Sequence, residues 1–303
     1  MTKEPFCPGC WPLPAAERCQ DSFSRLGVLK AHWECWSECN LPCSFCYRTR
    51  GVPLDTEKAK KLLQALATAG ISQVVFAGGD PSIRPDIVDL ISHARGLNLR
   101  VEVQTNAHYT SAAFLEALEQ VDMVGLSLDG PDALTHDTFR GTRGNFDRVI
   151  SLMRFLNEKG VLLVIRTLVG KSNLESIPRI APLLADLPSV VRWSLLEFTP
   201  IGEGLVNRVA YDVTASLFES VVSKVSHTFP RPVSLDIFRS DAKVGAYALI
   251  TPSGDLYGTT DQPIGTYFPI VGSFTKDHLA TLADKLPFSR HNHLKRYGTL
   301  MNP

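Results

Sequence analysis

The chain has 303 residues, with 31 basic residues balanced by 31 acidic ones and a pI near 7.1. Its length suits one large α/β domain of barrel size or two modest domains, and its balanced charge argues against a nucleic-acid-binding or polybasic membrane surface. No apolar run reaches membrane-spanning length, and the first residues (MTKEPFCPGC) lack the apolar core of a signal peptide, so we expect a cytoplasmic protein without nucleic-acid or membrane partners.

The first 28 residues are rich in Pro and Cys without a clear period, so we expect an irregular leader. From Leu29 to about Gly204, β-rich apolar runs alternate with stretches of helical period, which is the pattern of repeated βα units. The first helix is expected to have Thr56 as its N-cap and to end at Gly70. The expected strands are 29–36, 73–77, 100–105, 121–128, 161–169 and 191–198. Six units are too few for a closed eight-fold barrel, so residues 29–204 are predicted to form a partial (βα)6 barrel resembling a TIM barrel.

The pattern changes after Gly204. Residues 212–226 have helical period, and a strand-like run turns on Pro252-Ser253-Gly254-Asp255, which is a hairpin pattern. The last residues indicate a short helix and an irregular basic tail. We therefore expect a small α+β extension over residues 205–303.

Polar residues and glycines occur where each predicted strand ends. In a parallel barrel the carboxyl ends of the strands meet at one rim, and functional residues lie on the loops there. These positions therefore predict a single site at that rim. They are the loop with Cys39, Cys43 and Cys46, then Gly78, Gly79 and Asp80, Thr105 and Asn106, Ser127 and Asp129, and Arg166 within the fifth strand.

Cys39, Cys43 and Cys46 have a C-x3-C-x2-C spacing, so their thiolates can converge on one inorganic centre. Three ligands leave one metal position open for chemistry. All seven cysteines lie in the first 46 residues, which favours local metal binding over a disulfide framework spread through the fold. A zinc knuckle or a disulfide on this loop is the alternative.

Four further segments resemble the radical S-adenosylmethionine enzymes. GGDP resembles their Gly-Gly-acid-Pro motif, and VQTNA resembles their third-strand Thr-Asn segment. GLSLDGPDALTHDTFRG resembles their Ser-x-Asp-Gly motif with its following helix, and EFTPIGEG resembles the end of their sixth strand. The resemblance covers about residues 29 to 204, in the order expected for the family.

The resemblance implies that Cys39, Cys43 and Cys46 hold a [4Fe–4S] cluster whose remaining iron binds the amino and carboxylate groups of S-adenosylmethionine (SAM). The cluster would cleave SAM to a 5′-deoxyadenosyl radical, which takes hydrogen from the substrate, and an electron donor such as flavodoxin or ferredoxin would supply the electron. The other implied SAM-binding positions are Phe45 beside the adenine, Gly78 and Gly79 near the methionine amino group, Asp80 (in place of the usual Glu), Thr105 and Asn106 on the third strand, Ser127 at the ribose with Asp129 beside it, and Arg140 or Arg166 at the methionine carboxylate.

Each position also has a structural interpretation. The GGDP segment could be a simple turn, Ser127 and Asp129 could cap a helix or form an Asx turn, and Arg166 could belong to a buried ion pair. Four more thiols, Cys7, Cys10, Cys19 and Cys35, could hold an auxiliary iron–sulfur cluster or zinc. Cys35 could equally be a small buried hydrophobic residue in the first strand, and Cys7 with Cys10 could be a redox pair.

The substrate is not apparent from the motifs. We expect radical chemistry on a small molecule of sugar or nucleoside type, in specialised metabolism. The alternatives are the same chemistry on a ribosomally made precursor peptide, by epimerisation or cross-linking, and a non-catalytic metal or redox sensor. The fate of the substrate radical, the regeneration of SAM and the oligomeric state stay open.

Overall fold

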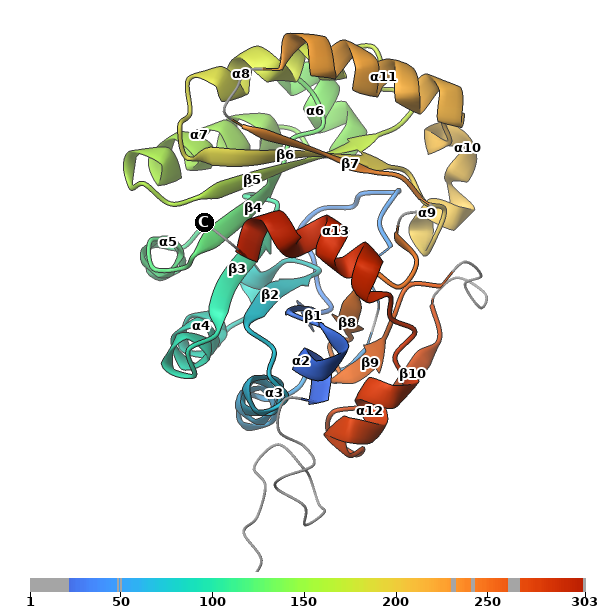
Figure 1. Ribbon diagram of the computed structural model, residues 1–303. Coiled ribbons are helices and arrows are strands. Elements are labelled where there is room, and N and C mark those ends of the chain that lie inside the picture. Colours follow the sequence, from blue (N-terminus) through green and yellow to red (C-terminus); the bar gives the residue numbers. More distant parts are fainter. Residues whose placement is uncertain are drawn as a thin grey trace, which may run out of the picture. The chain divides into compact units, whose positions relative to one another are not determined.

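The computed structural model of the protein describes residues 22–47, 49, 51–229, 233–240, 243–260 and 268–301 (Figure 1). The chain divides into two compact units. The first unit comprises residues 1–38, 48–102 and 241–303, and the second comprises residues 39–47 and 103–240. Strand β3 (Arg100–Thr105) runs across this division. Over the described ranges, no helix is both long and apolar enough to cross a bilayer.

The first unit contains a mixed sheet in the order β10-β9-β8-β1-β2. Strand β1 is parallel to both β2 and β8, whereas β9 is antiparallel to β8 and β10. Its elements are α2 (Ser22–Leu26), β1 (Lys30–Trp36), α3 (Thr56–Thr68), β2 (Gln73–Gly78), the 3₁₀ turn η1 (Pro81–Ile83), α4 (Ile87–Gly96), β8 (Ala248–Ile250), β9 (Asp255–Tyr257), β10 (Ile270–Ser273), α12 (Leu279–Lys285) and α13 (Arg290–Met301).

Helix α3 begins because Asp55 caps it. The Asp55 side chain accepts a hydrogen bond from the backbone N–H of Lys58 at 2.9 Å, which satisfies one of the first unpaired N–H groups of the helix. Thr56, the predicted cap, is instead the first helical residue, and its Oγ1 donates to Asp86 at 2.7 Å. The prediction of Thr56 as N-cap was wrong because the Asp one residue earlier has the extended backbone that a cap requires.

The second unit contains a parallel sheet in the order β4-β5-β6-β7. Its elements are α5 (Ala112–Leu118), β4 (Met123–Ser127), α6 (Ala133–Arg140), α7 (Asn145–Glu158), β5 (Leu163–Val169), η2 (Ile177–Ile180), α8 (Ala181–Ala185), β6 (Val190–Glu197), α9 (Glu203–Val206), α10 (Arg208–Tyr211), α11 (Ala215–Thr228) and β7 (Ser234–Phe238).

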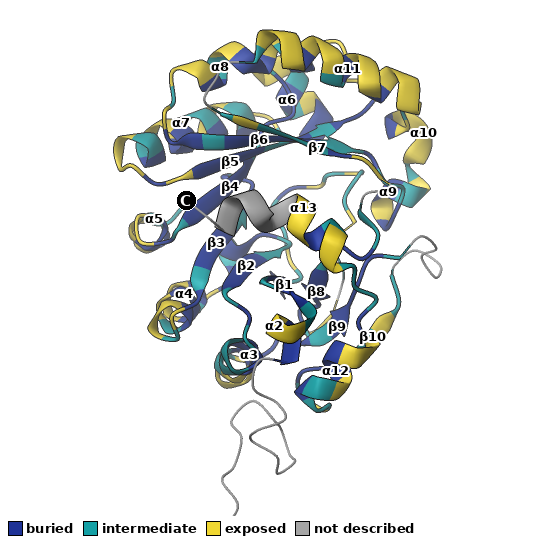
Figure 2. Ribbon diagram, in the orientation of Figure 1, coloured by how far each residue is buried: buried dark blue, intermediate teal, exposed yellow. Residues whose placement is uncertain are grey.

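Helices α7, α8 and α11 lie on one side of strands β5 to β7 (Figure 1). Several strand residues on that side are apolar and fully buried, among them Ile165, Trp193 and Leu195. The Trp193 ring packs against Phe229, which follows α11, with 5.3 Å between ring centroids. Figure 2 shows the outer surfaces of these helices exposed and the strands beneath them buried. Burial of the apolar stripe of each helix therefore holds this layer in place.

The predicted α/β class is confirmed, and all six predicted strands form, each within two residues of the expected bounds. The predicted hairpin forms between β8 and β9. Three features differ from the prediction: α2 lies within the leader predicted to be irregular, β7, beyond Gly204, adds a strand parallel to β6, and the tail predicted to be irregular contains α13. The domain boundaries at residues 28 and 204 stay a prediction.

Candidate active site

The cysteine motif lies on a loop, residues 39–47, that belongs to the second unit. Cys39, Cys43 and Cys46 are half-buried, and none of them forms a disulfide with another described residue. Asn106, which directly follows β3, donates from Nδ2 to Asn40 Oδ1 at 2.8 Å, and the same Nδ2 lies 3.5 Å from Cys39 Sγ. The loop is thereby attached to the carboxyl end of a strand, where the sequence predicts the site.

A second segment, residues 202–211, supports the loop from another direction. The backbone N–H of Glu203 donates to the Cys46 carbonyl at 3.0 Å, and Asn207 Nδ2 donates to the Ser44 carbonyl at 3.0 Å. Gly204 allows this approach, since a Cβ there would lie 2.8 Å from the carbonyl oxygen of Phe45. The cysteine loop is therefore held by contacts to a segment more than 150 residues away along the chain.

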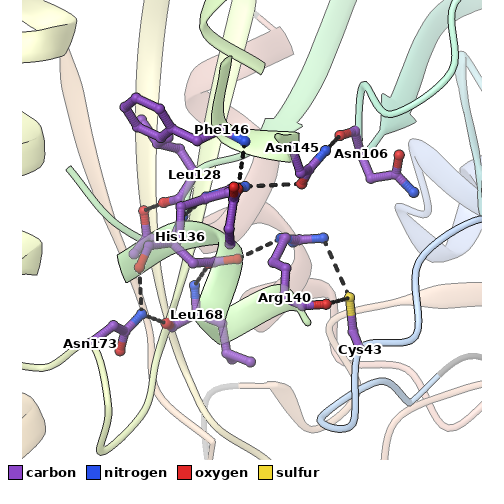
Figure 3. Close-up of polar contacts among 12 residues, drawn as sticks. Cys43, Asn106, Leu128, His136, Arg140, Asn145, Phe146, Leu168 and Asn173 are labelled. Carbon is purple, nitrogen blue, oxygen red and sulfur yellow. Dashed lines mark hydrogen bonds and ion pairs between the residues drawn. The ribbon is translucent and has the colours of Figure 1, made fainter. Parts of the chain in front are cut away.

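Arg140, the last residue of α6, lies between a carboxylate and a cysteine. Its Nε donates to Asp129 Oδ2 at 2.8 Å, and its Nη1 lies 3.9 Å from Cys43 Sγ (Figure 3). Asp129 is 1% exposed, and its other oxygen accepts from the backbone N–H of Leu168 at 2.8 Å. Because Asp129 is buried and held by the backbone, it both orients the Arg140 guanidinium and stabilises its positive charge.

The electrostatics of this pair favour a permanent cation beside the thiols. Burial acts to lower the pKa of Arg140, but Asp129 and the neighbouring thiols outweigh it, so the pKa is raised. Burial raises the pKa of Cys43 to about 11, while Arg140 acts in the opposite direction. A metal that binds the thiolate would displace this proton.

An aromatic cluster lies beside the loop. The Phe45 ring is 4.9 Å from Phe139 and 5.4 Å from Tyr211, measured between centroids, and the Arg140 guanidinium is 5.7 Å from the Phe45 centroid. Phe198 and Leu168 pack against the same cluster. The Tyr211 hydroxyl also shares a 2.6 Å hydrogen bond with the hydroxyl of Ser44 in the loop. Phe45 thus presents a flat apolar surface next to a cation, which suits a heteroaromatic base.

Sequence reasoning missed a polar network behind Asp129 (Figure 3). The backbone N–H of Asp129 donates to His136 Nδ1 at 3.0 Å, so His136 Nε2 carries the proton and donates to Asn145 Oδ1 at 3.0 Å. Asn145 then donates from Nδ2 to the Asn106 carbonyl at 2.9 Å. The signal available was the His four residues before Arg140 in α6. Its partners could not be identified because they come from other elements.

This network predicts a pH dependence of stability. Burial, followed by the nearby Arg140, lowers the pKa of His136, while Asp129 and Asp137 act in the opposite direction. Below the ordinary histidine pKa of about 6.5, the unfolded chain takes up a proton that the folded chain does not. Stability therefore falls as the pH drops from about 6.5 toward the lowered pKa of the folded state.

Urea unfolding of the full chain from pH 7.5 to pH 5 measures this loss. We expect His136→Gln to flatten the slope, and His227→Gln, at an exposed position of α11, to leave it as in the wild type. A slope that is unchanged in His136→Gln would contradict the assignment.

Gly78, Gly79 and Asp80 belong to the first unit, where Gly78 ends β2 and the other two residues follow it. Gly78 has φ +123°, and a Cβ there would collide with the Trp36 carbonyl oxygen. The N–H of Gly79 donates to that carbonyl at 2.6 Å, and Asp80 caps η1 by accepting from the Ser82 N–H at 2.9 Å. These contacts account for the glycines and the short acid as a turn. Their contact with the methionine amino group stays a prediction.

Two other predicted positions have local structural partners. Thr105 is buried, and its hydroxyl accepts from the Ala107 N–H at 3.2 Å. Cys35 is fully buried in β1, and burial raises the pKa of its thiol to about 12. The thiol therefore stays protonated, and Cys35 packs as a small hydrophobic residue. Cys7, Cys10 and Cys19 lie outside the described residues, so the auxiliary site stays a prediction.

The donors beside the loop fit an iron–sulfur cluster, in which each thiolate binds its own iron. Across the described residues, no three His, Cys, Asp or Glu side chains are grouped so that they could hold one metal ion. The amide of Asn106 near Cys39 and the guanidinium of Arg140 near Cys43 are donors of the kind that stabilise cluster thiolates.

A cysteine loop at the carboxyl ends of parallel strands, with a cation and an amide beside its sulfurs, is the arrangement expected of an iron–sulfur enzyme on an α/β scaffold. The family model of the Radical SAM superfamily matches residues 33–184, just over half of the chain. The protein belongs to the radical SAM superfamily and is a radical SAM enzyme, whose cofactors are a [4Fe–4S] cluster and SAM.

Two curated relatives are similar in sequence. An AdoMet-dependent heme synthase from Oleidesulfovibrio alaskensis is 32% identical over 198 residues, covering 63% of this chain and 50% of that protein. A PqqA peptide cyclase from Rhodopseudomonas palustris is 29% identical over 194 residues, covering 62% of this chain and 51% of that protein. The chain thus spans about half the length of the curated relatives it matches.

Solved structures share the fold over most of the chain. Streptococcus suis SuiB bound to S-adenosylmethionine has a TM-score of 0.67 at 19% identity. The match covers 90% of this chain and 68% of the SuiB chain. An anSMEcpe structure with bound AdoMet and Cp18Cys peptide has a TM-score of 0.66 at 15% identity, covering 88% of this chain and 82% of that one. The predicted partial barrel is confirmed by this likeness.

Proposed function

We propose that the protein is a peptide-modifying radical SAM enzyme whose cofactor site is the cysteine loop and its neighbours in the second unit. The position of Arg140 carries the assignment: one end of its guanidinium is held by buried Asp129, and the other lies beside Cys43. The amino and carboxylate groups of SAM would bind the iron that no cysteine holds. The carboxylate would then lie next to a cluster ligand, where a fixed cation such as Arg140 could pair with it.

The other residues follow from this position. Cys39, Cys43 and Cys46 hold the cluster, and Phe45 provides the surface for the adenine. A cluster held there would, once reduced, supply the electron that cleaves SAM and so yields the radical that removes hydrogen from the substrate. Asp129 orients Arg140, and the segment 202–211 keeps the loop in place.

One further residue of the second unit belongs to the proposed cofactor site. Ser127 serves the ribose. A small electron-transfer protein, a flavodoxin or a ferredoxin, supplies the electron.

A peptide is the substrate class with most support. The SuiB structure bound to precursor peptide SuiA covers 86% of this chain, and the anSMEcpe structure above also holds a peptide. The PqqA peptide cyclase is a relative in sequence. A heme-type substrate is the second candidate, because the heme synthase is 32% identical. The relatives described above give no support to the sugar- or nucleoside-like substrate that we expected from the sequence.

The test begins with anaerobic reconstitution with iron and sulfide, followed by dithionite and SAM. We expect 5′-deoxyadenosine to form slowly without substrate. We expect its rate to rise when synthetic peptides encoded by short reading frames near the gene are added, with a mass change in one of them. Porphyrins and nucleosides serve as comparison substrates. Stimulation by a porphyrin or nucleoside alone would replace the peptide proposal, and an absence of 5′-deoxyadenosine would remove the cofactor assignment.

A further inference from the structure

One amide nitrogen of the cysteine loop is buried without a partner. Asn40 lies between Cys39 and Cys43, and its Nδ2 atom has no hydrogen-bond partner among the described residues. A buried N–H group that donates to nothing has given up the hydrogen bond that water would accept from it. Native proteins seldom leave such a group unless a water or a bound group receives it. The Asn40 amide therefore needs an explanation.

The direction of the Asn40 amide follows from a backbone donor. The N–H of His108 can only donate, and it lies 2.8 Å from Oδ1 of Asn106. The Nδ2 of Asn106 is then the end that meets Asn40, at 2.8 Å. Since Nδ2 is also a donor, the Asn40 atom that it meets must be the oxygen. The Asn40 nitrogen is thus the end that is left over, and the alternative orientation would bring two donors together.

Asn106 is itself fixed by its surroundings. Its carbonyl accepts from Nδ2 of the fully buried Asn145 at 2.9 Å (Figure 3). The next residue, Ala107, has a left-handed φ of 61°, and its N–H donates to the Thr105 hydroxyl at 3.2 Å. A residue other than glycine keeps such a backbone only where the structure around it imposes it. Asn106, and through it the Asn40 amide, is therefore held in one direction.

This amide lies beside the first thiol of the motif. The Cys39 Sγ is 4.0 Å from Oδ1 of Asn40 and 3.5 Å from Nδ2 of Asn106. The Asn40 nitrogen belongs to the same small planar group as that oxygen, so it also lies close to Cys39. The thiolates and sulfides of an iron–sulfur cluster accept hydrogen bonds from N–H groups. A cluster on this loop would therefore offer acceptors to the unpartnered nitrogen.

We infer that Asn40 Nδ2 donates a hydrogen bond to a sulfur atom of the bound cluster and raises the reduction potential of the cluster. Reduction adds negative charge to the cluster, so an N–H group directed at sulfur stabilises the reduced form more than the oxidised form. Asn106 acts as a positioning residue, because it fixes the Asn40 amide. This inference rests on the proposed function, in which Cys39, Cys43 and Cys46 hold the cluster.

The test compares cluster reduction potentials in the reconstituted full chain, by redox titration followed with electron paramagnetic resonance (EPR). Asn40→Leu keeps the shape of the side chain and removes the donor. We expect the equilibrium constant for reduction to fall about tenfold, as is typical when a partner outside the ligand set is lost. For one electron, this lowers the potential by about 59 mV. Asn207→Ala is the control and should keep the wild-type potential, because the Asn207 amide holds the loop by donating to carbonyl oxygens.

Pulsed EPR detects the contact directly in protein whose asparagine side-chain amides carry ¹⁵N. We expect the reduced wild-type cluster to couple to ¹⁵N, and Asn40→Leu to lose one component of that coupling. Wild-type coupling in Asn40→Leu, an unchanged potential in that variant, or an equal shift in Asn207→Ala would each overturn the inference. Wild-type protein that assembles no [4Fe–4S] cluster would instead refute the ligand assignment of the proposed function.

Discussion

Replacing Cys43 by alanine should abolish SAM cleavage and remove the cluster iron. Cys43 is one of three thiols on the loop, and its Sγ lies beside the Arg140 guanidinium and backbone carbonyl. A cluster with three protein ligands cannot replace one of them from within the described loop, since residues 39–47 contain no fourth thiol. Iron and sulfide analysis after anaerobic reconstitution, together with 5′-deoxyadenosine measured by chromatography, checks both effects.

Cys35→Ala is the matched control. Cys35 is only four residues before Cys39, yet it is fully buried, and burial raises the pKa of its thiol to about 12. We expect this variant to retain its iron and its 5′-deoxyadenosine formation. Iron loss equal to that of Cys43→Ala would show that the ligand set is wrong, and full activity in Cys43→Ala would show the same.

Replacing Arg140 by glutamine should weaken both SAM binding and the fold. Its partner Asp129 is 1% exposed, so the variant leaves a buried carboxylate without its cation. Breaking one member of a buried ion pair costs about 3–5 kcal/mol of stability. The bound SAM would also lose its charge-assisted contact. Urea unfolding of the full chain and equilibrium dialysis with SAM measure the two losses separately.

A double-mutant cycle isolates the pair. Asp129→Asn removes the buried charge, so Arg140→Gln should cost much less stability in that background than in the wild type. Arg140→Lys keeps the positive charge and should recover part of the stability, but not the fixed direction that SAM binding needs. Additive stability losses in the cycle would show that the ion pair does not contribute as the structure indicates.

Local patterns in the sequence were sufficient for several features. The alternation of apolar runs and helical periods predicted six parallel strands to within two residues, because the side-chain periods of strands and helices are properties of short segments. The cysteine spacing and the polar residues at strand ends likewise predicted a site at one rim, since parallel strands bring their carboxyl ends together. The N-cap Asp55 and helix α13 were missed, although both are also local features.

Only the tertiary structure showed what surrounds the two arginines. Along the chain, Arg140 was the first candidate for the methionine carboxylate and Arg166 the second. The fold brings Arg140 to Cys43, 97 residues earlier, and lays Arg166 over Gly125 on the next strand. It also brings Asn207 and Tyr211 onto the cysteine loop. No periodic pattern encodes these contacts, because the direction of a long side chain depends on the space that distant residues leave for it.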